Sequence, residues 1–361
     1  MGKVLLAVHV FLFASTVIAE NNGLFPSDFL FGVGISAYQT EGAWDVDGRG
    51  ESIWDRWIHD NASHIANNDT ANAACDFYRW YQSDINRAAL FLNAAHFQFS
   101  ISWSRVLPNG YDINVKGILY YKSLIAEIVN NGMIPVATLY HYDLPQPLQD
   151  IGGWTNPEMV NYFVKYARTA FQNFDKVGYW LTFHDPRSVC RLGYGEGVHA
   201  PGLSLDGIGE YICSYFGLYA DPIYKGNWPQ LVIDRVAYRS NKENFTKSRL
   251  PKFNQEEIDY INGTFDFMAI NIFRTNLVAD ITEPEYGDPG YMKDMKAELS
   301  VDPHWNISTD GNAITPWSAR KSLIWLKDTY NNPEIFITGN GVSDEDDASV
   351  WRDNERIAYY N

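Results

Sequence analysis

Short apolar runs alternate with amphipathic stretches of helical period along this chain of 361 residues. The apolar runs predict strands at Phe29–Ser36, His96–Ser102, Ile134–Tyr140, Tyr179–Phe183, Phe267–Ile272 and Ile335–Thr338. Helical patterns between them cover Asn114–Asn130, Asn156–Phe174 and Ser318–Tyr330. Because a helix between two strands returns the chain to a parallel neighbour, this order predicts an α/β fold. No Pro-, Gly- or Ser-rich linker interrupts residues 20–361, which we expect to form a single domain.

The charge of the chain limits its partners. Its formal net charge is −16, whereas binding to nucleic acid needs a basic surface, so we expect no nucleic-acid partner. An acidic chain also repels anionic membranes, and no membrane partner is expected. The sequence contains no C-x-x-C, no H-E-x-x-H and no Gly-rich phosphate loop, so we expect no metal and no other cofactor. The sequence makes no prediction of an oligomeric state.

The first residues have the features of a secretory signal peptide. Lys3 is followed by the apolar run Val4–Phe13, and Val17–Ala19 fits a cleavage site before Glu20. The apolar run is too short to span a bilayer comfortably. We therefore predict that residues 1–19 are a signal peptide and that the protein is secreted and extracellular.

Other residues fit that route. N-x-S/T sequons, which accept N-glycans in secreted proteins, begin at Asn61, Asn68, Asn244, Asn262 and Asn306. The cysteines are Cys75, Cys190 and Cys213. One disulfide and one free thiol is the simplest oxidised state of three cysteines, and the spacing does not choose the pair.

Polar and aromatic residues gather after the first four predicted strands. They are Gln39, Ser102–Trp103, His141–Tyr142 and His184–Asp185. In a (β/α)₈ barrel the active site is built at the carboxyl ends of the strands. Loops are polar in any protein, but four consecutive strand ends with groups that bind sugar hydroxyls favour a functional site.

Several long motifs then appear in a fixed order. They are Phe29–Ala43 (F-L-F-G-V-G-I-S-A-Y-Q-T-E-G-A), Phe99–Arg105 (F-S-I-S-W-S-R), Leu139–Gln146 (L-Y-H-Y-D-L-P-Q), Ser248–Pro251, Asp266–Phe267, Thr315–Trp317 and Ile337–Gly341. Together they resemble glycoside hydrolase family 1, the β-glucosidases and myrosinases, from about Phe25 to Ile357. The family's third motif reads L-Y-H-W-D-L-P-Q, with Trp where this chain has Tyr142. The resemblance implies a TIM (β/α)₈ barrel and a retaining mechanism with two catalytic carboxylates.

The resemblance places this chain's catalytic positions in altered motifs. Thr182–Pro186 (T-F-H-D-P) is similar to the family's T-F-N-E-P, so Asp185 stands at the acid/base position and His184 at the Asn that binds the substrate 2-hydroxyl. Asp185 is shorter than Glu by about 1.5 Å, and a catalytic group misplaced by about 1 Å can lose on the order of a hundredfold in rate. Gly339 stands at the nucleophile position, where no covalent intermediate can form. We expect the missing side chain to leave a polar gap.

Two further positions differ from the family in a way that fits the loss of the nucleophile. The family's Arg and Tyr partners of the nucleophile correspond to Gln98 and Phe273. Asp344 and Glu345 follow the altered motif, but a solvated acidic run is the better interpretation, because a nucleophile needs a closely set position. Gln39 and His141 match the family's glucose-binding residues, which implies a small-molecule β-glucoside as the partner.

The resemblance also implies missing parts. The family's fifth strand would lie between Tyr211 and Tyr224, where the chain is too short for it, and Asn361 precedes the eighth strand. We therefore expect a barrel without the fifth and eighth strands. Three hypotheses follow: an active β-glucosidase, a secreted glucoside-binding pseudoenzyme, and a truncated remnant. Because the nucleophile position is Gly339, we expect a β-glucosidase-like protein whose hydrolysis is lost or severely reduced.

Overall fold

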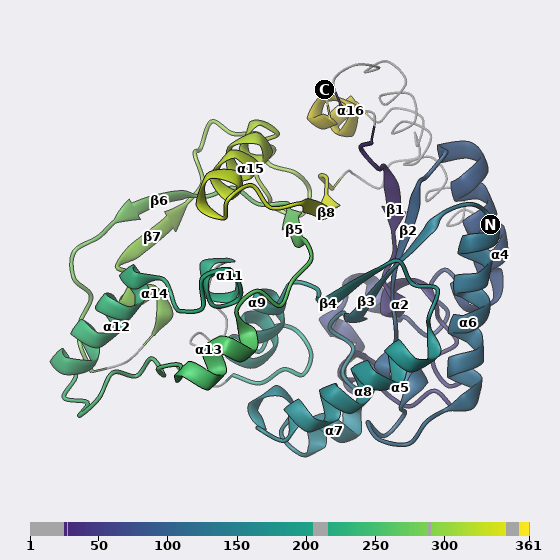
Figure 1. Cartoon of the computed structure of the whole chain (residues 1–361), viewed down its shortest axis with the longest axis horizontal. Coiled ribbons are helices and arrows are strands. Elements are labelled where there is room, and N and C mark those ends of the chain that lie inside the picture. Colours follow the sequence, from purple (N-terminus) through teal and green to yellow (C-terminus); the bar gives the residue numbers. More distant parts are fainter. Residues whose placement is uncertain (1–24, 27, 205–215, 288–289, 344–353, 361) are drawn as a thin grey trace. The chain divides into compact units, whose positions relative to one another are not determined.

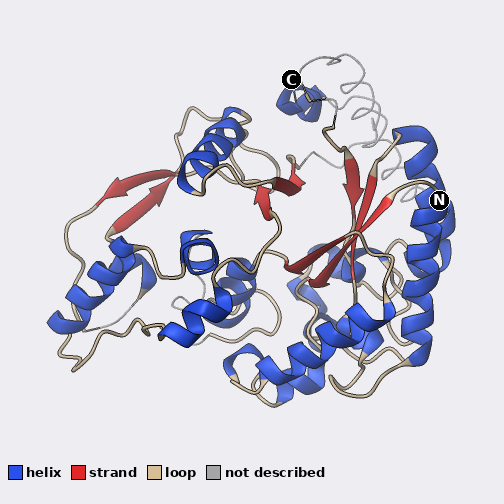
Figure 2. Ribbon diagram, viewed as in Figure 1, coloured by secondary structure: helices blue, strands red, loops and turns tan. Residues whose placement is uncertain are grey.

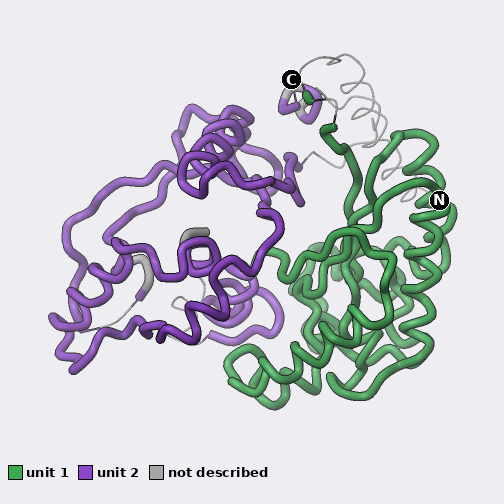
Figure 3. Tube along the Cα trace, in the orientation of Figure 1, with its two compact units in different colours: residues 1–185, 348–352 green, residues 186–347, 353–361 purple. Residues whose placement is uncertain are grey.

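A computed structural model of the chain describes residues 25–26, 28–204, 216–287, 290–343 and 354–360. The chain divides into two compact units, coloured separately in Figure 3. Unit 1 comprises residues 1–185 and 348–352, and unit 2 comprises residues 186–347 and 353–361. The expectation of one domain stays a prediction. The predicted signal peptide, Cys213, Asp344 and Glu345 lie outside the described residues.

Unit 1 is built around a four-stranded parallel sheet (Figure 1). Its strands are β1 (Gly32–Gly34), β2 (His96–Ser100), β3 (Ile134–Tyr140) and β4 (Tyr179–Phe183), in that spatial order. β1 is shorter than the predicted Phe29–Ser36, because only Gly32–Gly34 pairs with β2 while the rings of Phe29 and Phe31 pack on each other at 4.8 Å. The other three strands lie where the apolar runs predicted them.

Helices connect these strands (Figure 2). The long ones are α4 (Phe77–Leu92), α6 (Val115–Asn130) and α8 (Met159–Asn173), and the last two agree with the predicted periodicity. Asn114 begins α6 by accepting a hydrogen bond from the Lys116 amide. The short helices are α2 (Ala37–Thr40), α3 (Ile53–Asp60), α5 (Trp103–Val106) and α7 (Gln146–Asp150), with 3₁₀ turns at Ala62–His64, Ala66–Asn68 and Gly153–Thr155.

The core of unit 1 lies between the sheet and these helices. Trp103 stacks on Tyr166 at 4.5 Å, and both are fully buried. The Tyr166 hydroxyl lies within hydrogen-bonding distance of the carbonyl oxygens of Ile101 and Leu139, at 2.9 and 2.8 Å. Because a buried hydroxyl must be paired, these contacts fix α8 against the ends of β2 and β3.

A buried ion pair holds the loops at the same edge of the sheet. Arg105 Nε donates to Glu41 Oε2 at 2.9 Å, and the Tyr121 hydroxyl donates to Glu41 Oε1 at 2.6 Å. The Ser102 amide donates in turn to the Tyr121 hydroxyl at 2.7 Å. These bonds join the segment after α2 with α5 and α6, so the chain segments that follow β1 and β2 have a fixed position.

Unit 2 contains two separate strand pairs. β5 (Met268–Ile272) and β8 (Ile335–Asn340) are parallel, as their apolar runs predicted. β6 (Leu277–Asp280) and β7 (Ala297–Ser300) form an antiparallel pair that the sequence did not predict, because every residue of β6 is exposed and no apolar face is needed. The helical elements of unit 2 are α9 (Pro186–Ser188), a π-helical turn (Val189–Gly195), α11 (Phe216–Lys225), α12 (Gln230–Lys242), α13 (Gln255–Ile261), α14 (Tyr291–Met295), α15 (Trp317–Thr329) and α16 (Asn354–Tyr360).

The core of unit 2 forms where β5 packs against α11 and α15. Its buried members are Ala220, Met268, Ile270, Ile272, Leu326 and Tyr330. Within the part of the chain that the structure describes, no parallel strand lies between β4 and β5 or after β8. The family's fifth and eighth barrel strands are not the elements labelled β5 and β8, and their absence from this chain stays a prediction.

The two described cysteines, Cys75 and Cys190, are in different states. Cys190 is disulfide-bonded and Cys75 is a free, exposed thiol, in agreement with one disulfide and one free thiol. All of the sequon asparagines are exposed. Among the described residues, no helix is both long and apolar enough to cross a bilayer.

Candidate active site

The strand ends of unit 1 bring most of the predicted site residues to one edge. Since β1 to β4 are parallel, the segments that follow them emerge at the same edge of the sheet. His141 and Tyr142 follow β3, and His184 and Asp185 follow β4. Gln39 lies in α2, just after β1. The structure therefore places these residues at one edge of the sheet, and their role as a site stays a prediction.

His141 and His184 stack on each other. Their ring centroids are 3.8 Å apart and the rings are tilted by 17°. Burial lowers the pKa of His141 well below 6.5, and the charge of His184 would lower it further. Burial also lowers the pKa of His184, although the carboxylate of Asp185 opposes this. Both rings are therefore neutral at pH 7, and a neutral imidazole offers one donor and one acceptor to a hydroxyl.

Asp185 is held by Tyr142, a strand-end residue to which the sequence motifs gave no role of its own. The Tyr142 hydroxyl donates to Asp185 Oδ2 at 2.9 Å. Tyr142 has a φ of 70° and Asp185 a φ of 41°, the left-handed region that costs a non-glycine residue about 1 kcal/mol or more. Tyr142 stands where the family motif has Trp, and that difference was the available signal in the sequence.

Gln39 and Gln98 differ in their surroundings. Gln39 is exposed, and its Oε1 accepts a hydrogen bond from the Ser36 hydroxyl at 2.5 Å. Gln98 is buried in the middle of β2 and pairs in register with Gly34 of β1. Gln39 is thus available to a ligand, whereas Gln98 is enclosed by the sheet.

Gly339 lies in unit 2, near the end of β8. It pairs with Asn271 of β5, next to a register shift between Ile270 and Asn271. A Cβ at Gly339 would lie 2.6 Å from Phe273 Cζ and 2.9 Å from Asn271 Oδ1, both closer than real Cβ contacts. The expectation of a polar gap here is therefore wrong, because the Phe273 ring fills the place where a side chain would begin.

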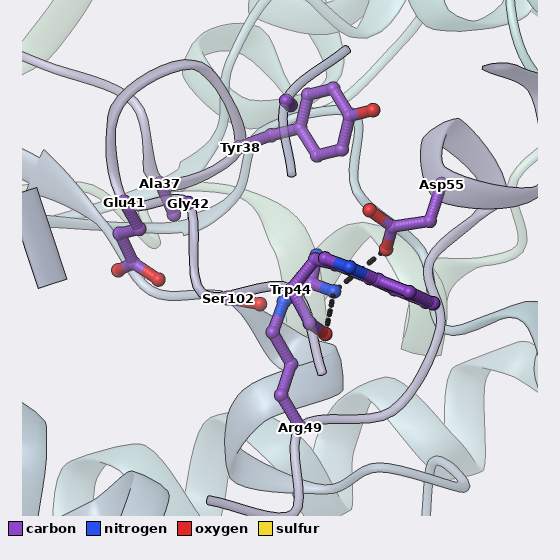
Figure 4. A pocket seen from close by; sticks show the side chains of 9 residues that line it. Ala37, Tyr38, Glu41, Gly42, Trp44, Arg49, Asp55 and Ser102 are labelled. Carbon is purple, nitrogen blue, oxygen red and sulfur yellow. Dashed lines mark hydrogen bonds and ion pairs between the residues drawn. The ribbon is translucent and has the colours of Figure 1, made fainter. Parts of the chain in front are cut away.

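A small pocket in unit 1 lies beside the Arg49–Asp55 ion pair (Figure 4). Arg49 donates to Asp55 Oδ2 at 2.7 Å and to the Trp44 carbonyl at 2.8 Å. The pocket is lined by Ala37, Tyr38, Glu41, Gly42, Trp44, Arg49, Asp55, Ala71 and Ser102. None of the predicted sugar-binding residues is among them, so this pocket is not the predicted site.

Asp143 is a buried carboxyl two residues after His141. Burial raises its pKa from 3.8 to about 7, while the charge of Arg49 acts in the opposite direction.

In the described ranges, no group of three or more His, Cys, Asp or Glu side chains could hold a metal ion.

Comparison with known proteins identifies the family. The model of glycosyl hydrolase family 1 matches residues 21–216 and 212–361, almost the whole chain. The chain belongs to glycosyl hydrolase family 1. Myrosinase 1 of Brevicoryne brassicae is 35% identical over 395 residues, which are 93% of this chain and 83% of the relative. The cytosolic β-glucosidase of Cavia porcellus is 34% identical over 90% of this chain and 81% of its own length.

Solved structures of family 1 agree with the sequence comparison. Aphid myrosinase superposes with a TM-score of 0.83 at 34% identity, covering 93% of this chain and 84% of that protein. The family 1 β-glucosidase from Thermotoga maritima gives a TM-score of 0.79 at 29% identity, covering 93% and 83%. The chain is therefore a β-glucosidase-like member of family 1 with its α/β-barrel fold.

Proposed function

We propose that this chain is a secreted family 1 protein that binds β-glucosides but hydrolyses them very slowly or not at all. The observation that carries the proposal is Gly339 at the position of the nucleophile. A retaining glycosidase needs two carboxyl groups about 5–5.5 Å apart, one as acid/base and one as nucleophile. With glycine at one of these positions, the covalent step has no carboxylate to perform it.

The acid/base position is weakened but keeps a carboxyl group. Asp185 is paired with the Tyr142 hydroxyl, and its backbone is in the left-handed region. A general acid contributes on the order of 10² to 10⁴ in rate when it is well placed. Asp185 is shorter than the family's Glu and is already hydrogen-bonded, so it supplies only part of that factor.

Binding is better supported than turnover. His141 and His184 are neutral, so both can hydrogen-bond to sugar hydroxyls without the cost of burying a charge. Gln39 is exposed at the same edge of the sheet. These features favour a glucoside-binding protein over an active β-glucosidase. The remaining alternative is a remnant that does not fold stably.

Calorimetric titration of the mature chain with a non-hydrolysable β-thioglucoside tests the proposal. We expect saturable binding that His141→Ala abolishes. The matched control His304→Ala changes a side chain that is 91% exposed and should leave binding intact. Cooperative unfolding without binding would overturn the binding function, and the absence of cooperative unfolding would favour the remnant.

A further inference from the structure

The contact between Phe273 and Gly339 explains why position 339 carries no side chain. Phe273 directly follows β5, and two atoms of its ring, Cζ and Cε2, would lie 2.6 and 2.8 Å from a Cβ at position 339. The backbone of Gly339 is not in the left-handed region, so its conformation alone would accept any residue. Glycine is needed here because of space and not because of φ.

Two side chains, Phe273 and Asn271, border this space and differ in how easily they move. Phe273 is 44% exposed, so its ring can be removed with little damage to the core. Asn271 Oδ1, the other close atom, accepts a hydrogen bond from the Thr338 hydroxyl at 2.8 Å and is held in place. The Phe273 ring is therefore the larger and more removable part of the obstruction.

We propose that Phe273 is a steric plug that excludes side chains and small anions from position 339. The inference rests on the proposed function, in which this position belongs to the lost nucleophile. It implies that Glu at 339 alone can place its carboxylate only where the Phe273 ring is displaced, because the ring lies where the first atoms of the new side chain would be. It also implies that azide or formate cannot replace that carboxylate while Phe273 is present.

A double-mutant cycle on thermal unfolding tests the plug without any assay of activity. Gly339→Ala should lower the melting temperature of the parent, because the methyl group meets the ring. In the Phe273→Ala background the same change should lower it clearly less or raise it, since alanine reduces the entropy of the unfolded chain. The matched control is Gly34→Ala, whose Cβ would have no neighbour closer than 3.5 Å and should be tolerated in both backgrounds. An equal decrease for Gly339→Ala in both backgrounds would overturn the plug.

An anion assay tests the chemical consequence. With dinitrophenyl β-glucoside and azide, the azide nitrogen bonds to the anomeric carbon while the bond to the aryl oxygen breaks. Dinitrophenolate leaves with the electron pair, so no proton is required, and α-glucosyl azide forms. We expect azide to leave the parent's rate unchanged and to raise the rate of Phe273→Ala at least tenfold. Azide acceleration of the parent would overturn the plug. If the thermal cycle shows coupling but azide has no effect on Phe273→Ala, the plug stands and position 339 is not the nucleophile site.

Discussion

The Tyr142 hydroxyl donates a hydrogen bond to Asp185 Oδ2 over 2.9 Å, and the two residues follow neighbouring strands of the unit 1 sheet. They are 43 positions apart in the sequence. The bond gives the carboxyl group at the acid/base position a defined orientation. It also joins two residues whose backbones are both in the left-handed region, so each helps to hold the other's strained conformation.

Tyr142→Phe should therefore lower the free energy of unfolding by about 1 kcal/mol, the usual contribution of one hydrogen bond. Urea denaturation followed by tryptophan fluorescence measures this change. The control Tyr260→Phe alters a tyrosine that is 82% exposed and should have almost no effect. Equal stability of the Tyr142 variant and the parent would show that the bond does not form in solution.

The stacked histidines should titrate below their ordinary range. Burial disfavours both protonated rings, and the charge of His184 adds to this effect on His141, so both pKa values should lie below 6.5 although the Asp185 carboxylate raises that of His184. His184→Asn removes the repulsion, and we expect the pKa of His141 to rise but to stay below 6.5, because burial remains. Proton NMR of the imidazole Cε1–H resonances measures both values. A His141 resonance that titrates above pH 6.5 in the parent would contradict the buried stack.

Asp143 should make the protein less stable as the pH rises. Its pKa is raised from 3.8 to about 7 in the fold, so the folded state favours the protonated carboxyl. The contribution of Asp143 to the free energy of unfolding is fully present below pH 3.8 and is lost as the pH rises to about 7. Burial lowers the pKa of His96 to about 4 and so acts in the opposite sense, and Asp294 in unit 2 acts in the same sense as Asp143.

The variant Asp143→Asn isolates that contribution. The difference in unfolding free energy between parent and variant, measured in urea from pH 4.5 to 8, cancels the titration of the other groups. We expect the parent to lose stability relative to the variant as the pH rises. A constant difference across this range would show that Asp143 does not titrate with a raised pKa.

Secretion and glycosylation can be tested together. The mature protein should begin near Glu20 and carry N-glycans on exposed sequons such as Asn244 and Asn262. Intact-mass spectrometry before and after enzymatic deglycosylation, on protein from a eukaryotic secretion host, measures both. Protein that keeps Met1, stays in the cells and shows no mass change would refute this prediction.

The sequence predicted those parts of the fold that local patterns determine. β3, β4, α6 and α8 lie where apolar runs and helical periodicity indicated, because each must bury an apolar face. The β6–β7 pair escaped prediction because an exposed hairpin carries no such pattern. At the candidate site, the motifs gave the strand ends that carry His141, His184 and Asp185.

The contacts at these strand ends could not be predicted in the same way. The stack of His141 on His184 and the bond from Tyr142 to Asp185 depend on the register of β3 and β4. The Phe273–Gly339 contact depends on the pairing of β5 with β8. The sequence indicated that Phe273 stands where the family has Tyr. Only the structure placed the Phe273 ring where a side chain at 339 would begin.

Steady-state release of nitrophenol from an aryl β-glucoside by the purified mature chain tests the central claim most directly. We predict no more than trace release, because removal of the nucleophile alone forfeits several kcal/mol of transition-state stabilisation. The variant Asp185→Ala should be indistinguishable from the parent in this assay. Robust hydrolysis by the parent that Asp185→Ala abolishes would contradict the account, since another carboxylate would then be acting in place of the one missing at Gly339.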